Sequence, residues 1–115
     1  MSIIGIGVDI CSIKRVEEAI RRTPRFTQRV LSNEELQHAN ASDANYVAKR
    51  WAAKEAFSKA MGKGMMIGFH NITIRHEPSG KPYVECSAII DSSFAHLSLS
   101  DDGDNVIAFV VLSGS

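Results

Sequence analysis

The first part of the chain combines an apolar run with a helical repeat. Residues 2–8 carry branched apolar side chains at nearly every position that is not glycine, which is typical of a strand buried on both faces. Apolar residues then recur at helical spacing from Ile13 to Ile20, and Ser12 is placed to cap that helix. Pro24 forces a break. A strand followed by a short amphipathic helix is therefore predicted.

The middle of the chain predicts two more helices and a loop. Ser32 and Glu35 form a capping box, which opens a short helix through about residue 38. Residues 43–61 are rich in alanine and contain neither glycine nor proline, so they predict one long helix that ends in a glycine cap at Gly62. The glycine-rich residues 62–68 predict a loop whose backbone can approach a ligand closely.

The last part of the chain alternates apolar and polar residues in pairs of short segments. Residues 71–76 and 83–86 flank a turn at 78–82, and residues 96–100 and 106–112 form a second pair. These elements predict an α+β fold, a mostly antiparallel sheet packed with one long and several short helices. A length of 115 residues, 44% of them hydrophobic, suits a single domain over 1–115.

The charge is balanced overall but unevenly distributed. Thirteen basic and thirteen acidic residues give a net charge of zero, which argues against a generic nucleic-acid or membrane-surface binder. Up to Lys81, however, thirteen basic residues face eight acidic ones, so this part carries +5 and the remainder −5. Residues 14–29 hold six of the basic residues and two acids. This basic patch is either a solvated helix face or a surface for an anionic partner.

Cysteine usage and the N-terminal pattern bear on location. Cys11 and Cys86 are too few and too far apart for a disulfide framework or a paired-cysteine metal site, so we expect buried thiols in a reducing cytoplasm. The apolar start has no basic leader and is interrupted by glycines and Asp9. We therefore expect neither a signal peptide nor a membrane span.

Asp9 is the first candidate for chemistry. The Gly5-Ile6-Gly7 sequence before it resembles the start of a dinucleotide fingerprint, but the third glycine position holds Ile10 and no helix begins there. What remains is a carboxylate at the end of a buried strand, where side chains are held rigidly and ligands often bind. Such an acid is also common as a turn or cap residue.

The long helix carries the second group of candidates. Glu55 and Lys59 are four residues apart on one face, and Trp51 lies one turn earlier on the same stripe. A surface ion pair is the ordinary explanation, but the apolar neighbours of Glu55 indicate a partly buried carboxylate that needs a partner. Magnesium would supply one, since it takes one or two protein carboxylates and completes its shell with phosphate oxygens and water. Lys59 would then lie beside those phosphates, with Arg50 and Lys54 on the adjoining face.

In order along the chain, these residues resemble the holo-acyl-carrier-protein synthases, which are small phosphopantetheinyl transferases. The family pattern is G-I-G-x-D, then W/F-A-x-K-E-A-x-x-K and G-x-G, then G-K-P and H-x-S-L-S. The matching blocks here are residues 5–9, 51–59, 62–64, 80–82 and 96–100. The resemblance covers nearly the whole chain and implies the fold of that family.

The resemblance implies a reaction and its site. Asp9 and Glu55 would bind magnesium together with the coenzyme A pyrophosphate, and Lys59 would contact phosphate. Glu55 and Lys59 are the expected catalytic residues, with Glu55 the candidate proton acceptor. Phosphopantetheine would move from coenzyme A to a serine of apo acyl carrier protein, releasing adenosine bisphosphate and supporting fatty acid biosynthesis. The expected coenzyme A contacts are Arg50, Lys54, Lys59, Gly62, Gly64, Pro82 and Ser98.

An acidic carrier protein gives the basic patch a partner. Arg15 and Arg22 are seven residues apart and so project from one helix face, with Arg25 just beyond, and these three are the expected carrier-binding residues. Small members of the family are homotrimers with active sites between subunits, which is implied here as well. Apolar strands at 3–8 and 106–112 fit a sheet covered on both faces, although a monomeric core would explain them too.

The chain departs from the family pattern at two positions, and other functions stay open. Asp101 stands where many members have histidine, and Lys63 where many have threonine, so these positions leave individual coenzyme A contacts undecided. One alternative is a carrier-binding module that kept the fold without turnover. Another is a magnesium-dependent hydrolase of a nucleotide or of coenzyme A, with water as the nucleophile.

Overall fold

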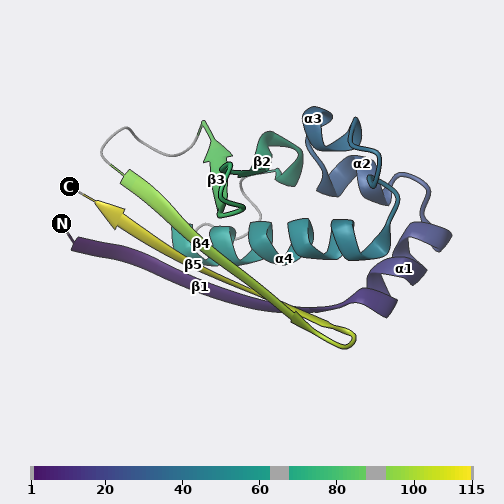
Figure 1. The fold of residues 1–115 in the computed structure, drawn as a ribbon, viewed down its shortest axis with the longest axis horizontal. Coiled ribbons are helices and arrows are strands. Elements are labelled where there is room, and N and C mark those ends of the chain that lie inside the picture. The colour runs from purple at the N-terminus through teal and green to yellow at the C-terminus, as the bar shows by residue number, and fades with distance from the viewer. Residues whose placement is uncertain (1, 63–67, 88–92, 115) are drawn as a thin grey trace.

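The structure, a computed structural model, describes residues 2–62, 68–87 and 93–114 (Figure 1). Within them one antiparallel sheet runs in the order β1-β5-β4-β3-β2. Its strands are β1 (Ser2–Ser12), β2 (Ile72–His76), β3 (Pro82–Cys86), β4 (Ser93–Asp102) and β5 (Asn105–Gly114). The helices are α1 (Ile13–Arg22), α2 (Phe26–Val30), α3 (Asn33–Leu36), α4 (Ala44–Met61) and the 3-10 turn η2 (Phe69–Asn71). The predicted α+β class with a mostly antiparallel sheet is confirmed.

The long helix α4 organises the molecule. It lies lengthwise along the sheet, while α1 lies at the end where β4 turns into β5 and the two termini lie together at the opposite end (Figure 1). Asp43 caps α4 through the backbone amide of Asn45, and Gly62 ends it in a left-handed conformation with φ of 71°. Both ends agree with the predicted helix. None of the helices in the described ranges is long and apolar enough to cross a membrane.

Two glycines let β1 approach α4 closely. A methyl group built on Gly7 would lie 2.0 Å from the carbonyl oxygen of Ala56, and one built on Gly5 would lie 2.0 Å from that of Ala60. Real side-chain carbons do not come this near to an oxygen, so any larger residue would force strand and helix apart. The Gly-x-Gly pattern is therefore a packing feature, and Ala56 on the facing helix is small for the same reason.

The helices of the N-terminal half partly match the prediction. Ser12 caps α1 by accepting the backbone amide of Arg15, and the capping box of Ser32 and Glu35 opens α3 as expected. Helix α2 was not predicted, because five residues are too short to show a period. It packs on α4 through Phe26, whose ring stacks on Trp51 with centroids 5.7 Å apart.

Within one chain, β1 and β5 are covered on their inward face only, so the chain alone does not provide the predicted burial of these strands on both faces. Gly7 and Cys11 point inward and are buried, whereas the outward Ile6 and Ile10 are 62% and 64% exposed. On β5, Val110 is buried and the outward Ile107 and Phe109 are exposed. Both faces are apolar, but α4 covers one of them. A monomeric core therefore does not account for the apolar run.

Candidate active site

Asp9, Glu55 and Lys59 gather where β1 passes α4. The close packing at Gly7 places Asp9, two residues further along, on the same inward face of the strand. Lys59 reaches back from the helix, and its Nζ donates to the carbonyl oxygen of Val8 at 3.0 Å and to Oδ1 of Asp9 at 3.4 Å. The lysine side chain is 54% exposed and that of Asp9 only 15%. The partly exposed ammonium-bearing side chain of Lys59 thus links the helix to the predicted strand residue Asp9.

The negative charges of Asp9 and Glu55 are only partly compensated by the positive charge of Lys59. Burial raises the pKa of Asp9, while the hydrogen bond and charge of Lys59 act in the opposite direction. Burial also raises the pKa of Glu55, the negative charge of Asp9 raises it further, and Lys59 lowers it. Oδ2 of Asp9 is buried and has no hydrogen-bond partner among the described residues. Such an arrangement favours either a shared proton or an additional cation.

Asp9 and Glu55 line a pocket of about 340 Å³ formed by β1, α1, α2 and α4. Trp51 and Phe26 form an apolar wall, and Arg15 brings a positive charge to its rim from α1. Cys11 also lines the pocket, and burial, followed by the charges of Asp9, Asp104 and Glu55, raises its pKa to about 11. A thiol of that acidity stays protonated at neutral pH, so Cys11 is a wall residue rather than a nucleophile.

The donor set fits a magnesium ion. Asp9 and Glu55 provide two hard oxygen ligands, and the unpaired Oδ2 of Asp9 is free to bind a cation. Groups of three or more His, Cys, Asp or Glu side chains that could hold a metal do not occur in the described ranges. A site with two protein carboxylates would leave the other positions of magnesium to water and phosphate oxygens.

Arg50 lies at a second pocket of mixed charge, whose lining also includes Glu34 and Glu35. Its guanidinium stacks over the ring of Tyr46, 3.7 Å from the centroid, and its Nε is buried without a hydrogen-bond partner in the part of the chain described. Arg50 shares this pocket of about 410 Å³ with His76 and Arg75. Burial lowers the pKa of His76, and the charges of Arg50 and Lys49 lower it further. The predicted anion contact at Arg50 is geometrically available.

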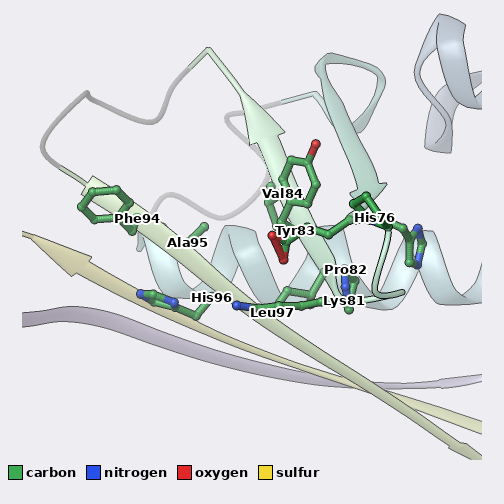
Figure 2. A pocket seen from close by; sticks show the side chains of 11 residues that line it. His76, Lys81, Pro82, Tyr83, Val84, Phe94, Ala95, His96 and Leu97 are labelled. Atoms are coloured by element: carbon green, nitrogen blue, oxygen red, sulfur yellow. The ribbon is translucent and has the colours of Figure 1, made fainter.

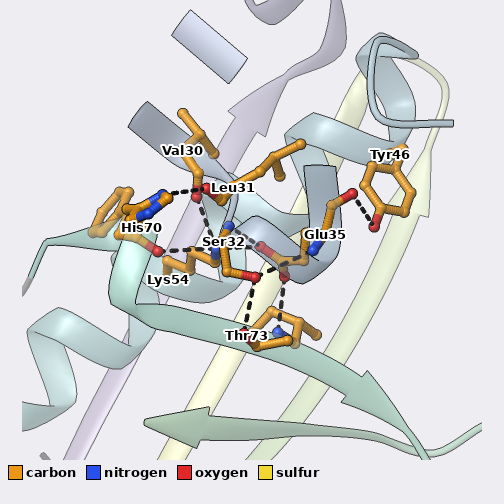
Figure 3. A network of polar contacts seen from close by, with 10 residues as sticks. Val30, Leu31, Ser32, Glu35, Tyr46, Lys54, His70 and Thr73 are labelled. Atoms are coloured by element: carbon orange, nitrogen blue, oxygen red, sulfur yellow. Dashed lines mark hydrogen bonds and ion pairs between the residues drawn. The ribbon is translucent and has the colours of Figure 1, made fainter. Parts of the chain in front are cut away.

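Lys54 is not available to a ligand, which corrects its prediction as a coenzyme A contact. Its side chain is 0% exposed, and its Nζ donates to Oε1 of Glu35 at 2.5 Å and to the carbonyl oxygens of Val30 and Phe69 at 2.7 and 3.0 Å (Figure 3). Glu35 also accepts the backbone amides of Ser32 and Ile74. Lys54 therefore ties α4 to α2, α3 and η2, and its ammonium faces inward.

Comparison with known proteins decides the family. The family model described as the 4'-phosphopantetheinyl transferase superfamily matches residues 5–110. The chain belongs to this superfamily. A holo-[acyl-carrier-protein] synthase of Ruthia magnifica subsp. Calyptogena magnifica is 44% identical, with 96% of each chain covered. The resemblance seen in the sequence is thereby confirmed, as is the expected class of enzyme, a holo-[acyl-carrier-protein] synthase.

Solved structures agree with that assignment. The crystal structure of the holo-[acyl-carrier-protein] synthase from Neisseria meningitidis superposes with a TM-score of 0.86 at 39% identity, covering 97% of this chain and 99% of that one. A holo-(acyl-carrier-protein) synthase from Bacillus anthracis, in complex with CoA (3',5'-ADP), gives 0.82 at 35% identity and 98% coverage of both chains. The fold of this phosphopantetheinyl transferase is thus that of its solved relatives.

Pro82 and Ser98 lie apart from the carboxylates of this phosphopantetheinyl transferase. Pro82 lines a pocket of about 500 Å³ where β3 and β4 separate on either side of the Tyr83 and His96 pair (Figure 2). Ser98 is exposed on β4 opposite Phe109, on the apolar outward face of the sheet. Neither residue lines the Asp9 pocket within the described chain. The predicted coenzyme A residues are therefore spread over two faces of one subunit.

The other predicted site residues of the transferase lie on the surface or outside the described residues. Arg15, Arg22 and Arg25 are exposed, and Arg15 lies at the Asp9 pocket. Gly62 is the exposed C-cap of α4, and Gly64 and Lys63 lie outside the described residues. Asp101, at the family's frequent histidine position, lies 3.8 Å from Lys49 of α4 as an ion pair.

Phe26 and Cys11 are pocket residues that the sequence did not single out. The predicted burial of the Cys11 thiol is confirmed. Its position in the same pocket as Asp9 follows from the alternation of side chains along a strand. The spacing of Gly7, Asp9 and Cys11 at every second residue could have predicted that all three face the same side of the strand. Phe26 had none, because its contact with Trp51 depends on the turn at Pro24.

Proposed function

We propose that this protein transfers phosphopantetheine from coenzyme A to a serine of apo acyl carrier protein, with magnesium held by Asp9 and Glu55. The observation that carries the proposal is a pair of partly buried carboxylates, in which the charge of Asp9 raises the pKa of Glu55, beside a lysine at a pocket with an arginine on its rim. The names of the relatives support the carrier, and complexes of solved relatives with coenzyme A support the donor.

Asp9 and Glu55 would hold the ion, which, when bound, neutralises charge on the pyrophosphate and so favours attack at the β-phosphorus. Oδ2 of Asp9 is the atom that gains a partner. Because each carboxylate raises the cost of ionising the other, the site binds a divalent cation better than it tolerates two bare charges. Asp9 is rigid in β1 and needs no rearrangement for this role.

Lys59 and Glu55 would act on the reacting groups. The ammonium of Lys59 is more than half exposed and can move from Asp9 to a phosphate oxygen on the leaving adenosine bisphosphate. Glu55 lines the same pocket as Asp9, beside the reacting groups, and is the candidate proton acceptor. It would take the serine proton, directly or through a water, as oxygen attacks phosphorus.

Other residues would position the two substrates. Arg50, with its unpaired Nε, would bind a phosphate of coenzyme A, and Gly62, Gly64, Pro82 and Ser98 would make further contacts. Arg15, Arg22 and Arg25 would bind an acidic carrier surface, because all three are exposed and Arg15 borders the reacting groups.

The outward apolar face of β1 and β5, with Ile6, Ile10, Ile107 and Phe109, supports the expected homotrimer. These side chains are exposed in one chain, and a continuous apolar surface of this kind is typical of a subunit interface. Ser98 lies on the same face, so a neighbouring subunit would complete the coenzyme A site. Light scattering after gel filtration would give three times the chain mass. The cysteine pattern, which suggested a reducing cytoplasm, fits this role.

Mass spectrometry of the carrier tests the reaction. Protein, apo acyl carrier protein, coenzyme A and magnesium are mixed, and the carrier should gain the mass of one phosphopantetheine, with no gain when magnesium is chelated. If the protein binds several carriers but none of them gains mass, it is a carrier-binding module and not an enzyme. Breakdown of coenzyme A in the absence of carrier would instead indicate a hydrolase.

A further inference from the structure

The turn between β4 and β5 reaches across to the start of α1. Figure 1 shows this hairpin tip beside the first turn of the helix. Asp104, at the turn, makes three contacts with consecutive residues there. Its backbone oxygen accepts the amide of Ile13 at 2.8 Å, its Oδ1 accepts the amide of Lys14 at 2.9 Å, and its Oδ2 accepts the hydroxyl of Ser12 at 2.5 Å. The hairpin is therefore clamped to the helix by one residue.

The contact with Ser12 extends the clamp to Arg15. A hydroxyl has one proton to donate and oxygen lone pairs to accept with. Because Ser12 gives its proton to Asp104, its oxygen is oriented to accept the amide of Arg15 at 3.3 Å. The Asp104 carboxylate is ionised over a wide range, since these hydrogen bonds lower its pKa. A charged acceptor at a helix N-terminus also suits the helix dipole.

We propose that Asp104 is a positioning residue for carrier docking, which sets helix α1 on the sheet so that Arg15 stands at the Asp9 and Glu55 pocket. The inference rests on the proposed function, in which α1 binds the carrier. Asp104 itself touches neither substrate. It acts through Ser12 and the first two amides of α1, and loss of the clamp would let the basic helix shift relative to the reacting groups.

Charge and clamp predict opposite results when Asp104 is replaced. Removing a negative charge beside a basic helix should, by long-range electrostatics, tighten the binding of an acidic carrier. Losing the clamp should weaken it. Asp102, exposed on the same hairpin, offers a matched control because Asp102→Ala makes the same charge change without removing these bonds.

Steady-state kinetics on the trimeric enzyme test the proposal. Asp104→Ala should raise KM for apo carrier roughly fivefold, the equivalent of losing one helix N-cap, with KM for coenzyme A and kcat within about twofold of wild type. Asp104→Asn should fall between, because its amide oxygen still accepts from Lys14 but its nitrogen cannot accept from Ser12. Asp102→Ala should leave KM for carrier unchanged or lower. Ser12→Ala combined with Asp104→Ala should raise KM by less than the product of the two single effects, because both changes remove the hydrogen bond between Ser12 and Asp104.

Several outcomes would overturn the inference. If Asp104→Ala leaves KM for carrier unchanged or lowers it, Asp104 acts through its charge. If Asp104→Ala lowers kcat and raises both KM values by similar factors, Asp104 supports general stability. If Asp104→Ala does not fold, Asp104→Asn decides, and wild-type carrier KM in that variant rejects the positioning role. Arg15→Ala distinguishes a failure of the proposed docking surface from a failure of the positioning role. If Arg15→Ala leaves KM for carrier unchanged, the carrier does not dock on α1. If Arg15→Ala raises this KM and Asp104→Ala does not, the carrier docks on α1 and the positioning role of Asp104 is wrong.

Discussion

Two lysines of α4 pair with acids of other elements, Lys54 with Glu35 of α3 and Lys59 with Asp9 of β1, and the two pairs are built in opposite ways. Lys54 and Glu35 have side chains that are 0% and 3% exposed, and protein oxygens and amides surround both charges. Lys59 and Asp9 are 54% and 15% exposed, and Oδ2 of Asp9 has no partner within the described ranges. Glu55, adjacent to Lys54 in sequence, belongs to the second arrangement.

Under the proposed function, the difference separates a structural pair, Lys54 and Glu35, from a pair that serves the reaction, Lys59 and Asp9. A buried pair with all its hydrogen bonds made is rigid, and removing one partner strands the other charge. A carboxylate with an unpaired oxygen beside a second carboxylate is unfavourable until a ligand binds. Since Lys54 and Glu55 are consecutive, their side chains leave the helix in different directions, one into the core and one into the pocket.

Replacing Lys54 should give the largest effect and would test the closed pair. Lys54→Met keeps the length of the side chain but leaves Glu35 and two carbonyl oxygens without their donor. We expect a loss of about 3–5 kcal/mol in the free energy of unfolding, measured by denaturant titration. Lys49→Met is the matched control on the same helix, since Lys49 makes a partly exposed ion pair worth at most about 1 kcal/mol. Similar stability of the two variants would contradict the contrast.

Glu55→Gln should produce the reverse pattern, because it alters the open arrangement. We expect kcat with apo carrier to fall about 100-fold or more, as for loss of a general base, which is roughly 2.7 kcal/mol in activation free energy. Stability should not fall, because burial and Asp9 already disfavour the charge of Glu55 in the metal-free protein. The elution volume on gel filtration should match that of the wild type, so that any oligomer is unchanged.

Glu85→Gln provides the control for this substitution. Glu85 is exposed on β3, where it pairs with Arg75 at 3.0 Å, and it does not line the Asp9 pocket. Its kcat should remain at the wild-type value. Near-normal turnover in Glu55→Gln would refute the catalytic role of Glu55 and would remove the functional half of the comparison.

The ends of α4 were predictable because their chemistry is local. Asp43 and Gly62 act on backbone groups of the neighbouring turn, and the capping box of Ser32 and Glu35 spans four residues, so the sequence pattern contains the whole interaction. The hairpins were predictable for the same reason. Helix α2 was not, since it depends on the packing of Phe26 against Trp51.

The inward direction of the Lys54 side chain could not be predicted from the sequence. Lys54 and Lys59 are both lysines of one helix, and Lys54 turns inward because Glu35, nineteen residues earlier, and the carbonyl oxygen of Phe69 meet there. The family motif contains both lysines and does not distinguish them. Likewise, the resemblance implied that Asp9 and Glu55 lie together, whereas the close contact of Gly7 with α4 that brings them to one pocket required the structure.

Gly7→Ala tests whether close packing supports the open arrangement. The added methyl would overlap the carbonyl oxygen of Ala56, so β1 must move away from α4 and take Asp9 with it. We expect a loss of about 2 kcal/mol in stability, with a further fall in kcat because Asp9 is displaced. Gly114→Ala is the control, since a methyl there would make an ordinary 3.5 Å contact with Ile4. If the two variants unfold at the same temperature, the close approach has no energetic role.

Magnesium should stabilise the open arrangement in a pH-dependent manner. Without metal, the pKa values of Asp9 and Glu55 are raised in the folded state, so the folded protein holds more protons than the unfolded chain and loses stability as pH rises above about 4 through those pKa values. A bound cation favours the ionised carboxylates and reverses this trend. The rise in Tm on adding magnesium should therefore increase between about pH 4 and 7.

At free magnesium near five times Kd, the stabilisation is roughly 1 kcal/mol, which corresponds to a few degrees in Tm for a domain of this size. Asp9→Asn should abolish both the shift and its dependence on pH, because the amide removes one ligand and one titrating group. Asp102→Asn should keep both, because Asp102 is exposed and is not among the residues that line the pocket. A magnesium shift in Asp9→Asn equal to that of the wild type would place the ion elsewhere, and Asp9 and Lys59 would then be an ordinary ion pair like that of Lys49 and Asp101.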